Sequence, residues 1–305
     1  MKSNVHLYKV ARHSFEVQLD ACSSLQEEMQ ESYAPFEAEK LDEKALFVVK
    51  VVSQVATDDI LESVFREKRH SEQEGALSVF STREGWLFEQ TQPFSEHSNA
   101  RICIDKEFKQ AKVAVRGTDQ QCRFAFNSAL MLCYLLATAQ SNTILTHSSC
   151  VVNDGKAYLF LGKSGTGKST HSSLWLKHIA DTMLLNDDHP ILRVNERGEV
   201  IAYGSPWSGK TPCYKNESAP VGGIVRIKRA LQNSIKKLTP VQAYASLTTS
   251  FSGMTWEAKL ADSRHSTIEK VIENVPCYTL SCLPDEEAAW VCHAAVTNRE
   301  VKEEA

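Results

Sequence analysis

The sequence of 305 residues lacks an apolar run long enough for a membrane-spanning helix, which needs about 20 residues. The nearest candidate, residues 124–139, is shorter and contains Asn127 and Ser128, so we interpret it as a buried helix. The N-terminus also lacks the apolar core of a signal peptide. We therefore expect a cytoplasmic protein with no membrane partner.

An excess of positive charge is missing as well. Lysine and arginine number 34 against 38 acidic residues, which gives a net charge of −4. No global basic field is available to hold nucleic acid, so we expect no nucleic-acid partner. The hydrophobic fraction of 42% and the charged fraction of 24% are those of an ordinary globular protein. They exclude a chain that is disordered, collagen-like or coiled-coil as a whole.

Cysteine pairs of the C-x-x-C type are absent among the nine cysteines. Cys282, Cys292 and His293 lie near one another, but their spacing fits no zinc-finger pattern. Without a signal peptide, the cysteines are typical of reduced, mostly buried small apolar residues.

The pattern of predicted secondary structure changes near residue 117. Before it, short β-prone runs such as 46–52, 85–88 and 102–104 predict a β-rich α+β N-terminal region at 1–117, to which no function can be assigned. After it, helical and strand patterns alternate, which predicts an α/β domain with a mixed sheet at 118–305. The expected strands there are 147–152, 156–161, 182–185, 191–194, 200–203, 223–227 and 277–280, and the expected helices are 118–139, 169–180, 240–251, 263–274 and 284–295.

One motif carries chemistry. An apolar strand, AYLFL, runs into GKSGTGKS, which fits the G-x-x-x-x-G-K-[ST] pattern of a P-loop and is followed by a helix. The glycines let successive backbone N–H groups surround a phosphate, and the helix adds its positive end. Lys168 would then contact the β- and γ-phosphates, and the Ser169 hydroxyl would bind Mg²⁺. The expected nucleotide-binding residues are Gly162, Lys163, Ser164, Gly165, Thr166, Gly167, Lys168, Ser169 and Thr170.

Two adjacent carboxylates, Asp187 and Asp188, end the next apolar strand about twenty positions after Lys168. One carboxylate at the tip of a neighbouring strand would complete a Mg²⁺ site, and the second could accept a proton from an attacking group. A structural turn formed with Pro190 is the other interpretation.

His147 stands 21 residues before Lys168, at the start of the strand that precedes the Asn153–Asp154–Gly155 turn. If the two strands pair across that turn, His147 lies level with the end of Leu161. It is then either a structural histidine, a second metal ligand or a contact to a transferred phosphoryl group.

The run HSSCVVNDGKAYLFLGKSGTGKST, followed by LLNDD, resembles the P-loop fold shared by HPr kinase/phosphorylase and phosphoenolpyruvate carboxykinase. The resemblance covers about residues 145–190 and weakens beyond them. It implies that Asp187 is the catalytic base, that Asp188 is a metal ligand and that His147 is a second-metal histidine. This sequence contains no match to a Gly-rich segment of the HPr kinases or to the oxaloacetate-binding arginine of the carboxykinases.

The segment 204–215 carries Trp207 and Lys210 between glycines. It is either a mobile lid that closes over a phosphoacceptor or an ordinary surface loop with a partly buried tryptophan. A basic stretch around Arg226 and Arg229 is either a solvated face or the source of an arginine that stabilises transition-state charge.

The sequence thus favours an ATP- and Mg²⁺-dependent phosphotransferase, with GTP or pyrophosphate as alternative donors and Mn²⁺ as an alternative metal. Asp187 and Lys168 would be its catalytic residues, and the acceptor would be a hydroxyl, such as a serine of a protein or peptide, or a small molecule. A carboxykinase-type enzyme and a nucleotide-binding regulator with little turnover are the alternatives. A homo-oligomer is compatible with the sequence.

Overall fold

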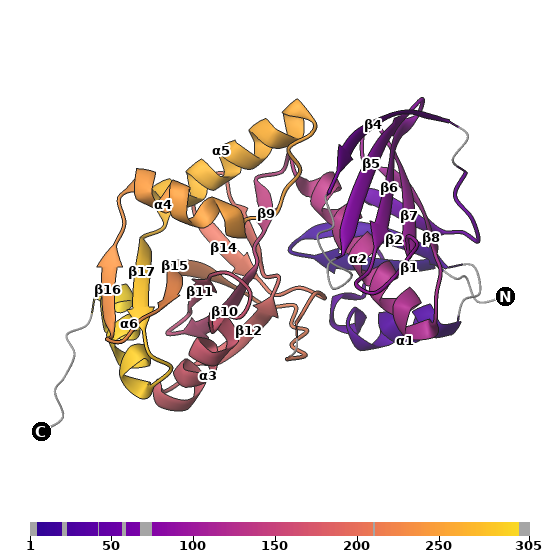
Figure 1. Ribbon diagram of the computed structural model, residues 1–305. Coiled ribbons are helices and arrows are strands. Elements are labelled where there is room, and N and C mark those ends of the chain that lie inside the picture. Colours follow the sequence, from indigo (N-terminus) through magenta and orange to yellow (C-terminus); the bar gives the residue numbers. More distant parts are fainter. Residues whose placement is uncertain are drawn as a thin grey trace, which may run out of the picture. The chain divides into compact units, whose positions relative to one another are not determined.

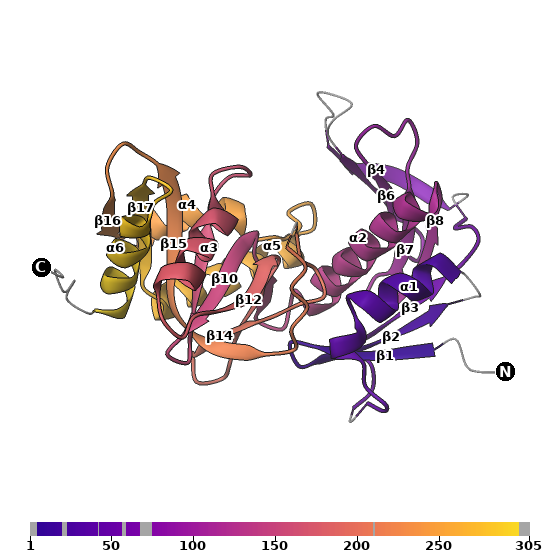
Figure 2. The same cartoon turned by 90° about the horizontal axis from the view of Figure 1, so that it is seen from below.

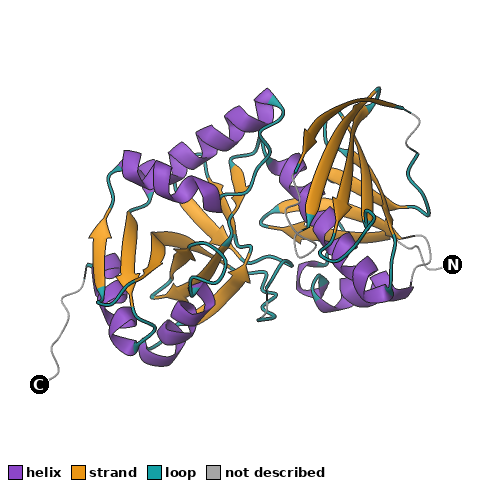
Figure 3. Ribbon diagram, in the orientation of Figure 1, coloured by secondary structure: helices purple, strands orange, loops and turns teal. Residues whose placement is uncertain are grey.

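The computed structural model describes residues 5–19, 23–41, 43–56, 59–67, 75–209 and 211–298. Within these ranges the chain forms two mixed β-sheets and six α-helices (Figures 1 and 3). It divides into two compact units, unit 1 (1–138 and 255–257) and unit 2 (139–254 and 258–305). The mixed α/β class predicted from the sequence is confirmed at this level.

Unit 1 contains a sheet with the order β1-β2-β3-β8-β7-β6-β5-β4, in which β3 runs parallel to β2 and to β8. Its elements are β1 (Val5–Val10), β2 (His13–Leu19), α1 (Ser23–Glu31), a short 3-10 helix (Ala34–Phe36), β3 (Phe47–Val51), β4 (Ile60–Arg66), β5 (Ala76–Thr82), β6 (Gly85–Thr91), β7 (Ala100–Asp105), β8 (Gln110–Val115) and α2 (Asp119–Thr138).

Helix α2 belongs to unit 1, whereas the sequence assigned residues 118–138 to the second domain. The helix packs against α1 and the strands β3, β7 and β8. Its buried Tyr134 hydroxyl donates to the Val10 carbonyl, and Asn127 accepts from Tyr33. The predicted boundary at 117 is therefore wrong, because the apolar face of the helix completes the core of the preceding sheet.

Unit 2 contains the second sheet, with the order β12-β10-β11-β15-β14-β13-β9 and with β17 and β16 joined to β15. Its elements are β9 (Thr143–Leu145), β10 (Ser148–Asn153), β11 (Lys156–Leu161), α3 (Lys168–His178), β12 (Met183–Asp188), β13 (Ile191–Val194), β14 (Val200–Tyr203), β15 (Ser218–Arg229), β16 (Ser234–Lys237), α4 (Pro240–Leu247), a short 3-10 helix (Thr248–Ser250), α5 (Ala258–Asn274), β17 (Cys277–Cys282) and α6 (Glu286–Thr297).

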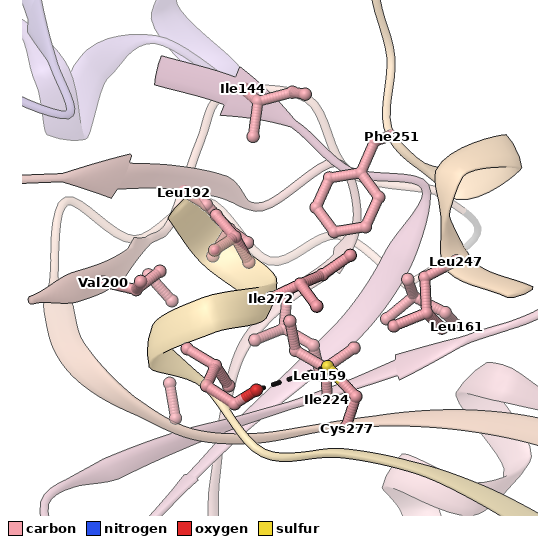
Figure 4. Close-up of a cluster of buried hydrophobic side chains, with 14 of the residues drawn as sticks. Ile144, Leu159, Leu161, Leu192, Val200, Ile224, Leu247, Phe251, Ile272 and Cys277 are labelled. Carbon is pink, nitrogen blue, oxygen red and sulfur yellow. Dashed lines mark hydrogen bonds between the residues drawn. The ribbon is translucent and has the colours of Figure 1, made fainter. Parts of the chain in front are cut away.

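Both faces of this sheet are buried. Successive strand residues point to opposite sides, so one strand supplies side chains to both faces. On β11, Leu159 and Leu161 enter the cluster that packs under α4 and α5 (Figure 4). Tyr158 and Phe160 enter the cluster on the other face, together with Trp175 of α3. Helices α3 and α6 pack against each other, and α3 covers β10, β11 and β12 (Figures 1 and 2). The sheet is thus a layer between two pairs of helices.

Local signals set the ends of the helices in unit 2. The Thr239 side chain and Gln242 form a capping box at the start of α4, with Pro240 at its first turn. Asp285 caps α6 by accepting from the Ala288 N–H, at the start that the sequence predicts.

The eight described cysteines are free thiols, and six of them are buried. Burial raises the pKa of Cys277 to about 12, which keeps that thiol protonated. Cys22 lies outside the described residues. Among the described residues, no helix is both long and apolar enough to cross a bilayer.

Candidate functional site

The glycine-rich loop of residues 162–167 connects β11 to α3. Strand β11 lies between β10, which runs antiparallel to it, and β15, which runs parallel to it. The loop therefore leaves the sheet beside β10 and β15, at the end of a strand that is buried on both faces. The strand, loop and helix follow one another as the motif requires.

Two glycines of the loop have backbone angles that favour glycine. Gly165 has φ of 76° and Gly167 has φ of 109°. Between them, the backbone N–H and hydroxyl of Thr166 donate to the Lys163 carbonyl at 3.1 and 2.7 Å. A Cβ at Gly165 would meet no atom within 4 Å, so its requirement is conformational. At Gly162 the requirement is steric, since a Cβ would lie 2.5 Å from Thr166 Oγ1.

The first turn of α3 is open to an anion. Helix α3 begins after Gly167, which has no side chain to cap it, and the first turn contains no acidic residue. The N–H groups of a first helical turn have no partner within the helix, and they carry its positive dipole end. Loop and helix together therefore supply unpaired donors of the kind that bind phosphate.

Asp187 lies near the end of the neighbouring strand β12, beside the first turn of helix α3. Antiparallel pairing puts Asp187 opposite Ser149 of β10 and Asp188 opposite Ser148. The Asp187 side chain is buried, and its Oδ1 accepts the Ser169 hydroxyl at 3.0 Å. A hydroxyl and a carboxylate from two elements therefore meet beside the loop, and both are hard oxygen donors of the type that Mg²⁺ prefers.

Asp188 has a different environment from its neighbour. Its two oxygens lie 3.2 Å from His147 Nε2 and 3.3 Å from His189 Nδ1. The two rings are stacked with centroids 5.9 Å apart. Burial alone raises the pKa of the Asp188 carboxyl, but hydrogen bonds from the two histidines outweigh it and hold the pKa below its ordinary value. Asp188 is therefore an ionised carboxylate at neutral pH.

Lys168 lies next to the same histidine. Its Nζ donates to the Gly162 carbonyl at 3.2 Å and lies 3.1 Å from His147 Nε2. Burial lowers the pKa of this ammonium group, and the charges of Asp188 and Asp187 partly offset that effect. Lys168, His147 and both aspartates thus form one cluster around the loop, as the hairpin register of residues 147–161 requires.

Trp207 does not present its ring to an acceptor. Its side chain is 3% exposed, and its carbonyl accepts from Asn186 Nδ2 at 3.3 Å. The same amide donates to Ser205. Hydrogen bonds to strand β12 hold this segment in the structure, which fits the interpretation as a loop with a buried tryptophan. The mobile lid stays a prediction. Lys210 lies outside the described residues.

The same segment fixes the backbone of the aspartate pair. The Gly209 N–H donates to the Asp187 carbonyl at 2.6 Å, and Ser208 bridges to Asp188. A Cβ at Gly209 would lie 3.1 Å from that carbonyl. Through these backbone contacts, residues 205–209 hold the end of β12 in place.

The sequence did not single out one residue of the site, His189, and it named another, Arg229, only as part of a basic stretch. His189 follows the aspartate pair directly, and that adjacency is a signal that could have identified it. Arg229, at the end of β15, donates to the Gly165 carbonyl. Its distance along the chain conceals this contact, which the parallel pairing of β11 and β15 creates.

The donor set sets a limit on metal binding. Within the described residues, no group of three or more His, Cys, Asp or Glu side chains is arranged to hold a metal ion. The Ser169–Asp187 pair nevertheless fits Mg²⁺, which is usually bound by one or two protein oxygens together with substrate phosphates and water. Among the described residues, Mg²⁺ would therefore be held by Ser169 and Asp187 together with a phosphate ligand and water.

Comparisons with known proteins add little to this geometry. The HPr(Ser) kinase/phosphatase from Coxiella burnetii is similar over 53% of this chain and 99% of its own, with a TM-score of 0.31 and 13% identity. No protein-family model matches the sequence, and no curated protein matches it. A likeness at this level says nothing about the chemistry of the site, which has to be inferred from its own residues.

Proposed function

We propose that unit 2 is an ATP- and Mg²⁺-dependent phosphotransferase of the P-loop type, which passes the γ-phosphate to a hydroxyl acceptor. The observation that carries this proposal is the meeting of Ser169 and Asp187 at 3.0 Å beside an uncapped helix start, with Asp188 as the next residue. A phosphate site needs only the loop and helix, whereas the second, ionised carboxylate supports transfer.

The two aspartates exchange the roles that the sequence resemblance implied. Asp187 touches Ser169, so we assign this pair to the cation. Asp188 touches His147 and His189 instead, so we assign it to the acceptor as the proton-accepting base. Each of its oxygens keeps a lone pair for the acceptor O–H, because each accepts from only one of these histidines.

Lys168 and His147 couple phosphate binding to this base. Nε2 of His147 carries either a proton or a lone pair, so it can serve only one of its two neighbours at a time. Once Lys168 turns to the phosphates, it no longer competes for Nε2, and the hydrogen bond from Nε2 to Asp188 orients that carboxylate. Bound Mg²⁺ would supply charge neutralisation between the phosphates, and the loop N–H groups and Lys168 would hold the departing diphosphate.

The acceptor is a serine of a protein or peptide, or a small-molecule hydroxyl. A labelling experiment tests the transfer. Full-length protein, γ-labelled ATP and Mg²⁺ are incubated with a lysate of the source cell, and the product is analysed for phosphoserine. We expect Mg²⁺-dependent label in an acceptor, a loss of at least about 100-fold in Lys168→Ala because its charge contacts ligand, and wild-type labelling in Lys177→Ala. The latter lysine is exposed in the last turn of the same helix.

Equal labelling by wild type and by folded Lys168→Ala, checked by circular dichroism, would contradict the phosphotransferase proposal.

A carboxykinase-type reaction is the second candidate. The contact of His147 Nε2 with Asp188 Oδ1 at 3.2 Å, next to Lys168, favours it, since these groups could share a second metal ion. Oxaloacetate-dependent nucleotide turnover would support this candidate, and label on a hydroxyl without oxaloacetate would support the first.

A further inference from the structure

The edge of the unit 2 sheet opposite the glycine-rich loop contains a cavity of about 380 Å³. Lys156 and Tyr158 line it from the start of β11, and Pro276 and Tyr278 line it from the start of β17. Because β11 and β17 both run parallel to β15, the starts of these strands reach the same edge, and the loop follows the other end of β11. The volume lies within the range of about 300–1,000 Å³ that small-molecule sites occupy.

Two glycines of β15 shape the wall between the sheet and the end of α6. A Cβ at Gly222 would lie 2.7 Å from the Tyr158 ring and 3.1 Å from its hydroxyl oxygen. A Cβ at Gly223 would lie 3.5 Å from Val296 of α6. The hydroxyl end of Tyr158 therefore lies against Gly222, which also lines the cavity, and any larger residue at position 222 would displace that ring.

Two lysines flank the cavity from different strands. Side chains alternate along a strand, so Lys156 shares its face of β11 with Tyr158, and Lys237 shares its face of β16 with Ile235. Tyr158 and Ile235 both pack in the cluster on the α3 and α6 face. The two lysines thus lie on the same face of the sheet, with β15 and β17 between them. Both are exposed, and neither has an ion pair or a side-chain hydrogen bond with another described residue.

Tyr278 adds an uncharged donor on the strand between these lysines. Its side chain is 6% exposed, and its hydroxyl has no hydrogen-bond partner among the described residues. Burial raises the pKa of Tyr278, so the hydroxyl keeps its proton at neutral pH and can donate. An unpaired polar group in a largely buried side chain is unfavourable, and a ligand oxygen would satisfy it.

Negative groups at this edge limit the charge of a ligand. Asp154 lines the cavity, as do Thr297 and Asn298 at the end of α6, where the last carbonyls carry the negative dipole end of the helix. A phosphate monoester carries a charge of about −1.5 to −2 at neutral pH, so a bisphosphate exceeds what two lysines balance and is repelled by these groups. Two carboxylates carry one charge each and match the two lysines.

We propose that this cavity binds a small dicarboxylate, with one carboxylate at Lys156, the other at Lys237 and the Tyr278 hydroxyl donating to the ligand between them. The inference goes beyond the proposed phosphotransferase and does not depend on it, because none of the residues that line the cavity belongs to the glycine-rich loop or to the cluster around Lys168.

Calorimetric titration of the full-length protein with glutarate tests the site. Butyrate is the monocarboxylate for comparison, and the bisphosphate ester of propanediol is the more highly charged dianion of similar length. Lys156→Gln and Lys237→Gln each remove one charge, and Tyr278→Phe removes only the hydroxyl. Lys236→Gln is the matched control, because Lys236 is exposed, points to the opposite face of β16 and lies outside the cavity. Circular dichroism checks that each variant is folded.

We expect wild type to bind glutarate at least about tenfold more tightly than butyrate, because a second carboxylate adds a second hydrogen bond between charged groups. Each of Lys156→Gln and Lys237→Gln should reduce glutarate affinity by about tenfold, and Tyr278→Phe should reduce it several-fold. Lys236→Gln should bind as wild type does, and the bisphosphate should bind more weakly than glutarate.

Three results would overturn the assignment. The first is no glutarate binding by wild type, or equal affinities for glutarate and butyrate. The second is glutarate binding that Lys168→Ala abolishes and that both cavity lysine variants retain, since the ligand would then lie at the glycine-rich loop. The third is tighter binding of the bisphosphate, which would exclude a dicarboxylate as the preferred ligand. A failure of the phosphotransferase assay would leave the glutarate titration and its interpretation unchanged.

Discussion

Asp187 and Asp188 are neighbours in the sequence with separate sets of contacts. Alternation along β12 turns Asp187 toward Ser169 of α3 and leaves Asp188 at the strand end, where its φ is 147°. Two histidines hold Asp188, whereas a hydroxyl contacts Asp187. The difference in contacts separates a metal ligand from a base without any difference in residue type.

Asparagine substitutions distinguish these roles. Asp187→Asn weakens a carboxylate–cation contact, so its loss of activity should shrink as Mg²⁺ or Mn²⁺ is raised. Asp188→Asn cannot accept a proton, so it should bind Mg·ATP within a few-fold of wild type and lose about 10²- to 10⁴-fold in transfer rate at all metal concentrations. Steady-state rates over a metal titration measure both effects.

Asp181→Asn is the control for these variants, since Asp181 is exposed and precedes the same strand. Rescue of Asp188→Asn by metal would reverse the assignment. Full activity in both variants would make the pair a structural turn.

For single residues, the sequence predicted which ones lie together in the site, but it did not predict which side chains are in contact. Lys168, Ser169, Asp187, Asp188 and His147 lie in one cluster because the motif and the hairpin fix their positions. The side-chain contacts depend on which face of β12 packs against α3, and the sequence pattern does not determine that face. The burial of Trp207 was left as one of two interpretations for the same reason, since its partner Asn186 is distant along the chain.

At the scale of elements, the hairpin of β10 and β11 carries the site. Its Asn-Asp-Gly turn fixes the register that pairs Ser148 with Leu161. The hairpin turn and the loop that follows the hairpin offer a matched pair of glycines, since Gly155 in the turn has φ of 69° and Gly165 in the loop has φ of 76°. At either position a Cβ would have no atom within 4 Å.

Alanine at these two glycines should separate strain from binding. Both Gly155→Ala and Gly165→Ala should lower the free energy of unfolding by about 1–2 kcal/mol, the strain of a left-handed conformation. Only Gly165→Ala should also weaken Mg·ATP binding, by more than about tenfold, because only its N–H belongs to the phosphate-binding loop. Denaturant unfolding and calorimetry measure the two effects. Equal ATP affinity in the two variants would contradict a role of the loop in binding.

Strands with a clear sequence pattern were predicted well, whereas short or exposed strands were missed. Strand β11 has the predicted bounds 156–161, because a strand buried on both faces is a continuous apolar run. The short strands β9 and β16 were missed, since three or four residues give too little pattern. Strand β4 was missed too, as most of its residues are exposed.

At the scale of the whole molecule, the division into two units follows from two separate sheets and their cores. The sequence predicted two regions from the change in pattern, but it assigned α2 to the second region, because the apolar residues of this helix would fit either core. The residues of the proposed site all belong to unit 2. No chemistry can be assigned to unit 1 from its described residues.

Stability of the folded protein should fall in mild acid because of His171. Burial lowers the pKa of this histidine to about 4, against about 6.5 in an unfolded chain. Between pH 6.5 and 4, His171 is protonated in the unfolded state but stays neutral in the folded state. The contribution of neutral His171 to the free energy of unfolding is therefore complete above pH 6.5 and is lost as the pH falls toward 4. The difference of about 2.5 pH units corresponds to about 3 kcal/mol. His171→Gln removes this group, so the destabilisation it causes at pH 7.5 should shrink steadily between pH 6.5 and 4. Urea unfolding of wild type and variant across this range measures the difference, in which the titration of all other groups cancels. A constant difference between the two proteins at every pH would show that His171 does not titrate in this way.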